Sequence, residues 1–304
     1  MIVVLRPFEL HRPSTVAEAV DLVSRLGDEA AVYAGGTELL LLLKEGLLRV
    51  GHLVDVKRIA GLDAIVDDGD WLSIGAAVTH RAVERSPVVG SRCPIVAQTA
   101  RHVANVRVRN VGTVAGNLAF ADPHSDVATL LLALEGVVRL ASPRGTREMP
   151  VAGFLRGAYE TVREPDEIVT AVRFRPWPAR TAAAYVKFGV HERPTLGVAV
   201  ALLLADGDTV MDARLAVGCV GPRPERIAAA EAWLRGQRPS DLVDDGHEAG
   251  GLAADHVDPV GDLHGSADYK RDMVAVFTRR AVRIAAARAL GRPVAARYPY
   301  AVVV

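Results

Sequence analysis

Two glycine-bearing stretches are the parts of this sequence whose residue types and spacing could do chemistry. In the first, Tyr33–Glu38, the glycines Gly35 and Gly36 lie between an expected strand and an expected helix. Glycines at such a turn let backbone N–H groups approach a ligand closely, and the start of the following helix attracts negative charge. An ordinary tight turn with Thr37 as the helix N-cap fits the same residues, so the turn alone leaves both interpretations open.

The second stretch runs over residues 107–117 and continues through Asp122 to Asp126. Gly112 and Gly116 tolerate unusual backbone angles, and Asn117 adds a short polar side chain. If this stretch faces the first, the two together form a cradle for a ligand with two phosphates. The alternative is a surface loop with solvated arginines.

Several well-known chemical motifs are absent from the sequence. Neither G-x-x-x-x-G-K-[ST] nor G-x-G-x-x-G occurs, so neither common nucleotide fingerprint is present. The lack of G-x-S-x-G and H-E-x-x-H leaves serine hydrolases and zinc proteases without support. His247, His256 and His264 fit no helical ligand pair and no compact zinc motif, so we interpret them as solvated loop residues and expect no metal on this chain.

Composition narrows the class of protein further. The 304 residues carry 36 Lys+Arg and 36 Asp+Glu, and a net charge of zero argues against bulk electrostatic binding of nucleic acid or anionic membranes. The longest apolar run, Gly197–Ala205, is far shorter than the roughly 20 residues of a membrane span. Met1–Leu10 contains Arg6 and Glu9, which is not typical of a secretory signal, so we expect a cytoplasmic protein.

The chain has two cysteines, Cys93 and Cys219. They favour buried thiols in a reducing compartment over a disulfide framework. Two thiols cannot supply the four thiolates of an ordinary iron–sulfur cluster. If this protein handles electrons, we therefore expect any metal centre to lie on another chain.

Strand and helix signals alternate at the start of the chain, which predicts a small parallel sheet with right-handed crossovers. The expected strands are Ile2–Leu5, Ala31–Ala34 and Leu53–Val56, and the expected helices cover Val16–Leu26 and Leu39–Leu48.

The pattern changes after about residue 70, and prolines in Arg175–Pro178 mark the expected domain boundary. Before it we expect strands at Trp71–Ile74, Val137–Leu140 and Ile168–Arg173, helices from Thr79, over Pro94–Val106 and over Val127–Leu134, and a polar loop at Arg107–Ser125. After it we expect strands at Ala183–Phe188, Gly197–Leu204 and Val210–Val220, helices at Pro224–Arg235 and Tyr269–Leu290, and a loop with at most one weak helix at Gly236–Ser266.

Three blocks, Ala34–Glu38, Arg109–Asn117 and Ala121–Asp126, together resemble the flavin (medium) subunits of the molybdenum hydroxylases, the family of aerobic carbon monoxide dehydrogenase and xanthine dehydrogenase. The resemblance continues to the far end, where Asp258–Asp262, Gly265–Arg271 and Arg279–Ala281 are similar to the C-terminal domain of those subunits. It covers essentially the whole chain, with its blocks in the expected order.

This resemblance implies an α+β protein with an FAD-binding fold of the vanillyl-alcohol-oxidase type. Two α/β subdomains, at about residues 1–58 and 59–177, would form an FAD-binding domain over residues 1–177. Residues 178–304 would form a C-terminal domain of the carbon monoxide dehydrogenase flavoprotein type, with a three-stranded antiparallel sheet and helices.

The implied function is that of an electron-transfer subunit of an oxidoreductase. A large subunit would carry the molybdenum cofactor, a small subunit would carry [2Fe-2S] clusters, and electrons would pass through FAD on this chain to a nicotinamide, a quinone or dioxygen. The resemblance implies assembly as a dimer of heterotrimers. Because the flavin supplies the redox chemistry, no catalytic side chain is expected here. The alternatives are a stand-alone FAD-dependent oxidoreductase with its own substrate, and a non-catalytic scaffold that has lost FAD.

The resemblance also implies which residues contact FAD. A loop would wrap the pyrophosphate, a second segment would meet it from the other subdomain, and single positions would lie near the flavin ring. The loop is Val32, Tyr33, Ala34, Gly35, Gly36, Thr37, Glu38 and Leu39, and the second segment is Thr113, Val114, Ala115, Gly116 and Asn117. Val103 and Ala104 would lie near the ring, Asp126 and Val169 would contact the cofactor, and the cation of Lys187 could stabilise negative charge on the reduced flavin.

Three positions depart from the family's usual residues. Ala115 stands where the first of two adjacent glycines is usual, and its methyl group is harmless at negative φ but would crowd a phosphate at positive φ. His264 stands where an arginine commonly precedes Gly-Ser-Ala, and His191–Thr195 lacks an aspartate–aromatic pair often found there. The departures at His264 and at His191–Thr195 bear on access to the flavin and on the choice of electron acceptor.

Overall fold

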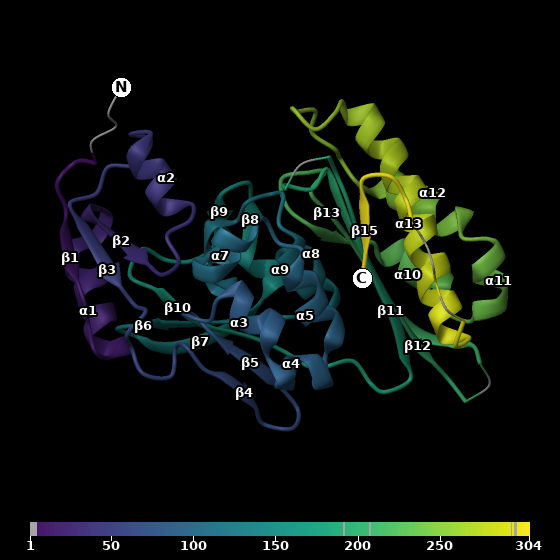
Figure 1. Ribbon diagram of the computed structural model, residues 1–304, viewed down its shortest axis with the longest axis horizontal. Coiled ribbons are helices and arrows are strands. Elements are labelled where there is room, and N and C mark those ends of the chain that lie inside the picture. Colours follow the sequence, from purple (N-terminus) through teal and green to yellow (C-terminus); the bar gives the residue numbers. More distant parts are fainter. Residues whose placement is uncertain (1–4, 191, 207, 293, 295–296) are drawn as a thin grey trace.

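The structure is a computed structural model that describes residues 5–190, 192–206, 208–292, 294 and 297–304 (Figure 1). Three sheets follow one another along the long axis of the molecule. The first is the parallel sheet expected from the alternating pattern, with strand order β1-β3-β2. It consists of β1 (Glu9–His11), β2 (Ala30–Tyr33) and β3 (His52–Asp55), linked through α1 (Val16–Leu26), the short 3₁₀ turn η1 (Gly27–Glu29) and α2 (Leu39–Lys44). The strand expected at Ile2–Leu5 lies almost wholly outside the described residues.

The second sheet is antiparallel, with strand order β4-β5-β10-β6-β7. Its strands are β4 (Ile65–Asp67), β5 (Leu72–Gly75), β6 (Val137–Ser142), β7 (Gly145–Pro150) and β10 (Ile168–Phe174). Between β5 and β6 the chain forms α3 (His80–Arg85), α4 (Pro87–Arg92), α5 (Pro94–Arg101), α6 (Val106–Val111), α7 (Val114–Phe120) and α8 (Asp126–Ala133). A short helix, α9 (Val151–Phe154), and the hairpin β8 (Leu155–Gly157) with β9 (Glu160–Thr161) complete this unit.

The polar loop expected at Arg107–Ser125 instead contains α6 and α7, and the single helix expected over Pro94–Val106 ends at Arg101. Side-chain caps explain the difference. The side-chain oxygen of Asn105 accepts from the backbone N–H groups of Arg107 and Val108 at 2.9 and 3.2 Å. The hydroxyl of Thr113 accepts from Gly116 N at 3.0 Å. Each cap satisfies backbone donors that a helix start would otherwise leave unpaired, so new helices begin among residues that look like loop.

The third sheet is antiparallel, with strand order β14-β13-β12-β11-β15. The three expected strands, β11 (Thr181–Phe188), β12 (Leu196–Leu204) and β13 (Val210–Gly218), form its centre. The expectation of three strands was too low, because the short strands β14 (Glu225–Arg226) and β15 (Ala301–Val303) extend the sheet to five.

Four helices cover one side of this sheet: α10 (Ala228–Leu234), α11 (Pro239–Asp244), α12 (His247–His256) and α13 (Ala267–Ala289). Two of them, α11 and α12, occupy the stretch that was expected to hold at most one weak helix. Packing explains α12, whose Gly250 lies so close to α13 that a Cβ there would fall 2.5 Å from the carbonyl oxygen of Ala275. A residue that weakens an isolated helix thus permits close contact between two helices.

The third sheet is buried on both faces, which joins it to the rest of the chain. Val198, Val200 and Leu202 of β12 pack in the core beneath the C-terminal helices, whereas Ala199 between them packs in the core of the first two units. Helix α8 lies against that second face, where a Cβ on Gly218 of β13 would fall 2.0 Å from the Thr129 hydroxyl. Burial on both faces accounts for the nearly unbroken apolar sequence of β12. No helix among the described residues is long and apolar enough to cross a bilayer.

Candidate functional site

A cavity of about 660 Å³ lies between the parallel sheet and the helices of the second unit. All but three of the residues expected to contact FAD line it. They are Val32, Ala34, Gly35, Gly36, Thr37, Glu38, Leu39, Val103, Ala104, Thr113, Ala115, Gly116, Asn117, Asp126 and Val169. Residues of Val32–Leu39 and of Thr113–Asn117, about eighty positions apart in the chain, therefore line one cavity. This is the arrangement expected if the two segments bind one ligand together.

The two glycine-bearing bends are in direct backbone contact at this cavity. A Cβ on Gly35 would fall 2.3 Å from the Val111 carbonyl oxygen and 2.6 Å from Gly112 Cα. A Cβ on Gly112 would fall 3.4 Å from the Thr37 hydroxyl. Gly36 has a φ of +71°, which side chains rarely adopt, and a Cβ there would meet the Tyr33 ring at 2.3 Å. Only glycine fits at the point where the bends meet.

The second bend is the first turn of α7 rather than a loop. Thr113 is the N-cap, and Ala115 lies buried within this turn. Ala115 is not among the residues with positive φ, so its methyl group adds no backbone strain. Ala115 is therefore no evidence for the alternative that this chain is a scaffold that has lost FAD.

The three expected contact residues that do not line the cavity are Tyr33, Val114 and Lys187. The Tyr33 ring lies beside the Gly36 bend with Lys57 Nζ 3.5 Å from its centroid. Val114 is buried in the core. Each supports a bend without facing the space between them.

Lys187 lies behind Asp126, which does line the cavity. Its Nζ donates to Asp126 Oδ2 at 2.7 Å and to the carbonyl oxygens of His102 and Glu192 at 2.9 and 3.0 Å. The hydroxyl of Tyr185 donates to Asp126 Oδ1 at 2.7 Å, and burial raises the pKa of Tyr185 well above its usual range. The lysine thus holds the aspartate in place, with all three of its N–H donors in use.

His80, which no pattern in the sequence distinguishes, is buried and lines the same cavity. Burial and the nearby Arg109 lower the pKa of His80 to about 4, so its imidazole is neutral at pH 7. Its Nδ1 has no hydrogen-bond partner within the described part of the chain. An unpaired polar atom in a buried wall is costly, and a polar ligand in the cavity would satisfy it.

A loop from the third sheet reaches the opening of the cavity. Arg193 lies 3.3 Å from Glu38 and 3.1 Å from Asp122, and so connects both sides of the opening. His124 Nδ1 lies 2.7 Å from the Pro194 carbonyl oxygen. These contacts escaped the sequence analysis because the partners lie 70 to 155 positions apart. His191, in the stretch noted for its departure from the family, lies outside the described residues.

The remaining candidates from the sequence lie elsewhere. His247 and His256 are the first and last residues of α12 rather than loop residues, although both are exposed as expected. His247 contacts Arg279, His256 lies near Glu225, and the His264 ring lies 4.6 Å from the His124 ring, so these three histidines do not form one cluster. Cys93 and Cys219 are buried, as expected. Burial raises the pKa of Cys93 to about 12 and that of Cys219 well above its usual range.

These residues fit an extended dinucleotide. Within the described residues no hydrogen bond uses the N–H groups of Gly35, Gly36 or Thr37, so the first bend can offer them to phosphates. The apolar side chains of Val103 and Val169 line the same cavity and suit a flat ring, and the unpaired Nδ1 of His80 can make one further hydrogen bond. A cavity of this kind between an α/β unit and a second helix-covered sheet is what an FAD-binding protein of the two-subdomain type requires.

Comparison with known families agrees with this conclusion. Residues 6–177 match the family described as the FAD binding domain in molybdopterin dehydrogenase. Residues 185–285 match the CO dehydrogenase flavoprotein C-terminal domain. The chain belongs to the family of FAD-binding subunits of the molybdenum hydroxylases, which are subunits of oxidoreductases.

Individual relatives are similar over nearly their whole length. The carbon monoxide dehydrogenase medium chain of Hydrogenophaga pseudoflava is 34% identical over 92% of this chain and 98% of its own. The nicotine 6-hydroxylase medium subunit of Paenarthrobacter nicotinovorans is 32% identical over 91% and 96%. Among solved structures, carbon monoxide dehydrogenase from Hydrogenophaga pseudoflava has a TM-score of 0.88 at 35% identity, covering 94% of this chain and 99% of that one. Quinoline 2-oxidoreductase from Pseudomonas putida 86 has a TM-score of 0.87 at 28% identity, with the same coverage. The expected α+β fold is confirmed.

Proposed function

We propose that this chain is the electron-transferring FAD subunit of a cytoplasmic molybdenum-containing hydroxylase or dehydrogenase. Its partners are a large subunit with the molybdenum cofactor and a small subunit with [2Fe-2S] clusters, assembled as a dimer of heterotrimers. Electrons from those clusters reach an external acceptor, a nicotinamide, a quinone or dioxygen, through this subunit. The two matched family segments and the medium-chain names of the relatives support this proposal.

The observation that carries the proposal is the contact of two glycine-bearing bends at one cavity. Bound FAD supplies the ability to accept and release electrons. The first bend, Val32–Leu39, holds its pyrophosphate through backbone N–H groups, and the first turn of α7 meets the pyrophosphate from the other side of the cavity. Val103, Ala104 and Val169 pack against the ring, and Lys187 fixes the carboxylate of Asp126 at the wall. Arg193 limits access at the opening.

We further propose that residues 1–177 form the FAD-binding domain, with subdomains at about 1–58 and 59–177, and residues 178–304 the C-terminal domain. The break falls between β10 and β11, where the prolines of Arg175–Pro178 interrupt regular structure.

FAD content tests the cofactor assignment. The purified chain is expected to absorb in the blue and near ultraviolet and to release one FAD per chain on denaturation. Gly36→Val places a side chain on the Tyr33 ring and is expected to abolish retention of FAD. Gly46→Val is the matched control, because Gly46 has nearly the same φ, +69°, with no atom within 4 Å of its Cβ position. A colourless protein that takes up no added FAD, or a Gly36→Val variant that keeps it, would contradict the proposal.

Isolation from the native host tests the partners. Molybdenum and iron are expected to co-purify with this chain, and its flavin is expected to be reduced by the holoenzyme substrate only when those partners are present. Reduction of the isolated chain by a substrate of its own would instead identify a stand-alone oxidoreductase.

A further inference from the structure

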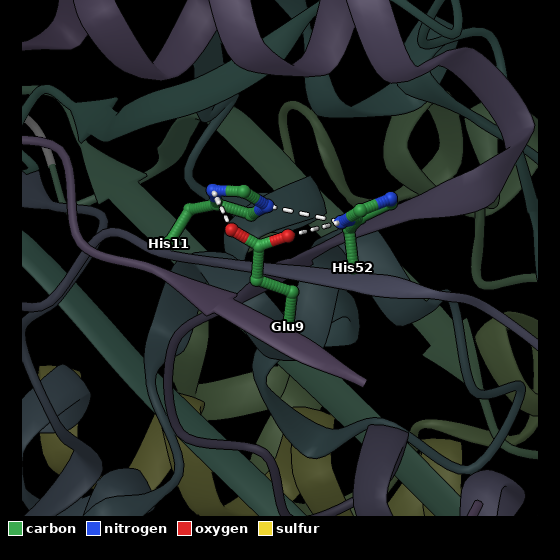
Figure 2. Close-up of side chains that lie close together, drawn as sticks. All are labelled: Glu9, His11 and His52. Atoms are coloured by element: carbon green, nitrogen blue, oxygen red, sulfur yellow. Dashed lines mark hydrogen bonds and ion pairs between the residues drawn. The ribbon is translucent and has the colours of Figure 1, made fainter. Parts of the chain in front are cut away.

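Glu9, His11 and His52 form a compact cluster on the first sheet (Figure 2). His11 Nε2 lies 3.0 Å from His52 Nδ1. The two carboxylate oxygens of Glu9 lie 3.7 Å from His11 Nδ1 and 3.7 Å from His52 Nδ1. None of the three residues lines the cavity assigned to FAD. The cluster is therefore separate from the proposed FAD site.

The register of two parallel strands brings the side chains together. Glu9 pairs with His52 and His11 pairs with Val54 in the β1–β3 ladder. Residues two apart on a strand project from the same face, and paired residues on neighbouring strands share a face, so all three side chains project from one side of the sheet. Because ordered backbone holds each of them, the cluster does not depend on a loop.

The chemistry of the three groups is that of a transition-metal site. Two imidazole nitrogens and one carboxylate oxygen are ligands that Zn²⁺ accepts in sites that keep one position for water. At Zn–N and Zn–O lengths of about 2.1 Å, tetrahedral ligands lie about 3.4 Å apart. His52 Nδ1 lies 3.0 Å from His11 Nε2 and 3.7 Å from a carboxylate oxygen of Glu9. One ligand atom from each of the three residues lies within 4.8 Å of the others, so the side chains must rotate to bring all three atoms to an ion.

The surroundings leave these groups available to a metal. The side chains of His11 and His52 are 18% and 23% exposed, so an ion there would be half-enclosed yet reachable from solvent. Within the described residues, the hydrogen bonds and ion pairs of the three side chains are made to one another. A divalent cation would be coordinated by one nitrogen of each imidazole and would neutralise the negative charge of the Glu9 carboxylate.

We propose that Glu9, His11 and His52 bind one divalent ion of the zinc class, with water completing its coordination. The nitrogen ligands favour Zn²⁺, Co²⁺ or Ni²⁺ over Mg²⁺ and Ca²⁺, which prefer oxygen. The ion joins the edge strand β1 to the central strand β3 and fastens the start of the chain to the first sheet. Only His247, His256 and His264 stand out as candidate ligands in the sequence. His11 and His52 do not, because 41 positions separate them along the chain.

Zinc binding to the full-length, FAD-loaded chain tests the proposal. After treatment with a chelator, the protein is titrated with Zn²⁺ in competition with a chromophoric chelator. One saturable site per chain with a dissociation constant of about 1 μM or tighter is expected, with proton release and weaker binding at lower pH. Excess Mg²⁺ should not compete. The lack of a saturable site would overturn the proposal.

Substitutions locate the site. His11→Ala and His52→Ala are each expected to weaken Zn²⁺ binding by at least about tenfold, and Glu9→Gln by a similar factor. His256→Ala is the matched control, because His256 also lies beside a glutamate, Glu225, at 3.6 Å, and within the described ranges of the chain no second imidazole contacts it. Unchanged affinity in His11→Ala and His52→Ala, or loss of affinity in His256→Ala, would overturn the assignment.

Two further measurements keep the test independent of folding and of the FAD proposal. Anomalous diffraction at the zinc edge from crystals of the parent protein should show an ion among these three side chains, and an ion held only elsewhere would contradict the proposal. FAD content should be unchanged in His11→Ala and His52→Ala, since neither residue lines the cavity. Loss of FAD together with zinc in these variants would contradict the independence of the two sites.

Discussion

Gly35 and Gly112 meet backbone to backbone, so that a Cβ on Gly35 would lie 2.6 Å from the Cα of Gly112. The first glycine precedes α2 and the second separates α6 from α7. Their contact fixes the distance between the parallel sheet and the helices that face it. The wall of the cavity, and with it the proposed cradle for FAD, depends on this approach.

Substitution of Gly35 by alanine should therefore damage the cradle. A single methyl group would overlap the Val111 carbonyl and force the two bends apart, at a cost of about 1–3 kcal/mol in unfolding free energy. FAD content is expected to fall at least severalfold, as measured by flavin absorbance per chain. Gly51→Ala is the control, because no atom lies within 4 Å of its Cβ position. Full FAD content in Gly35→Ala would show that the contact is dispensable.

Replacement of Lys187 by methionine should destabilise the chain by about 3–5 kcal/mol, because the Asp126 carboxylate would then be buried without its partner. Urea unfolding measures this loss. In the double variant Lys187→Met/Asp126→Asn both charges are gone, and part of the stability should return. If the losses from the two single substitutions simply add in the double variant, the two side chains are not coupled.

The buried His80 predicts a specific dependence of stability on pH. Its pKa of about 4 in the folded chain lies below the ordinary value of 6.5, so the unfolded chain binds a proton in a range where the folded chain does not. Stability is therefore undiminished above pH 6.5 and falls as the pH drops towards 4, by up to about 3 kcal/mol from this group. Unfolding measured across that range should show a shallower decline in His80→Gln than in the parent. If the unfolding free energy falls equally steeply with pH in the parent and in His80→Gln, burial in the folded chain does not hinder protonation of His80.

Arg193 should slow the release of FAD. It connects Glu38 and Asp122 across the opening, and exposed ion pairs contribute up to about 1 kcal/mol each, so the loss of both pairs corresponds to a change in rate of up to about thirtyfold. Arg193→Ala is expected to release FAD faster by up to that factor, with less sensitivity to salt than the parent. The change can be followed by flavin fluorescence after dilution. Arg180→Ala is the control, since Arg180 is similarly exposed and pairs with Asp206, yet lies outside the cavity wall. Equal rates in the parent and Arg193→Ala would remove the arginine from any role at the opening.

Much of the fold could be predicted from local pattern. Helix α1 begins and ends where its apolar spacing and Gly27 indicate, and β12 follows an apolar run. The missed elements depend on distant contacts or on polar residues. Strand β7 is largely exposed and has almost no apolar signature, and β15 pairs with β11, more than a hundred positions earlier. Helix α12 contains two glycines and is stabilised by its close packing on α13.

The residues of the candidate site also fall into two groups, those that the local sequence indicates and those that matter only through distant contacts. Gly35, Gly36 and Gly112 could be singled out because glycines at expected turns are visible in the sequence itself. The local backbone requires glycine only at Gly36, with its φ of +71°, whereas at Gly35 the requirement comes from contact with the distant Val111 and Gly112. His80 and Arg193 could not, since the significance of each depends on partners brought in by the fold. The Glu9–His11–His52 cluster is of this second kind, because it exists only in the register of β1 with β3.

The most direct measurement is a crystal structure of the chain with bound FAD. The pyrophosphate is predicted to lie between the bend at Gly35–Thr37 and the first turn of α7, with hydrogen bonds from backbone N–H groups of the bend and packing contact with the turn. FAD bound elsewhere, or a pyrophosphate that touches neither bend, would contradict the central claim.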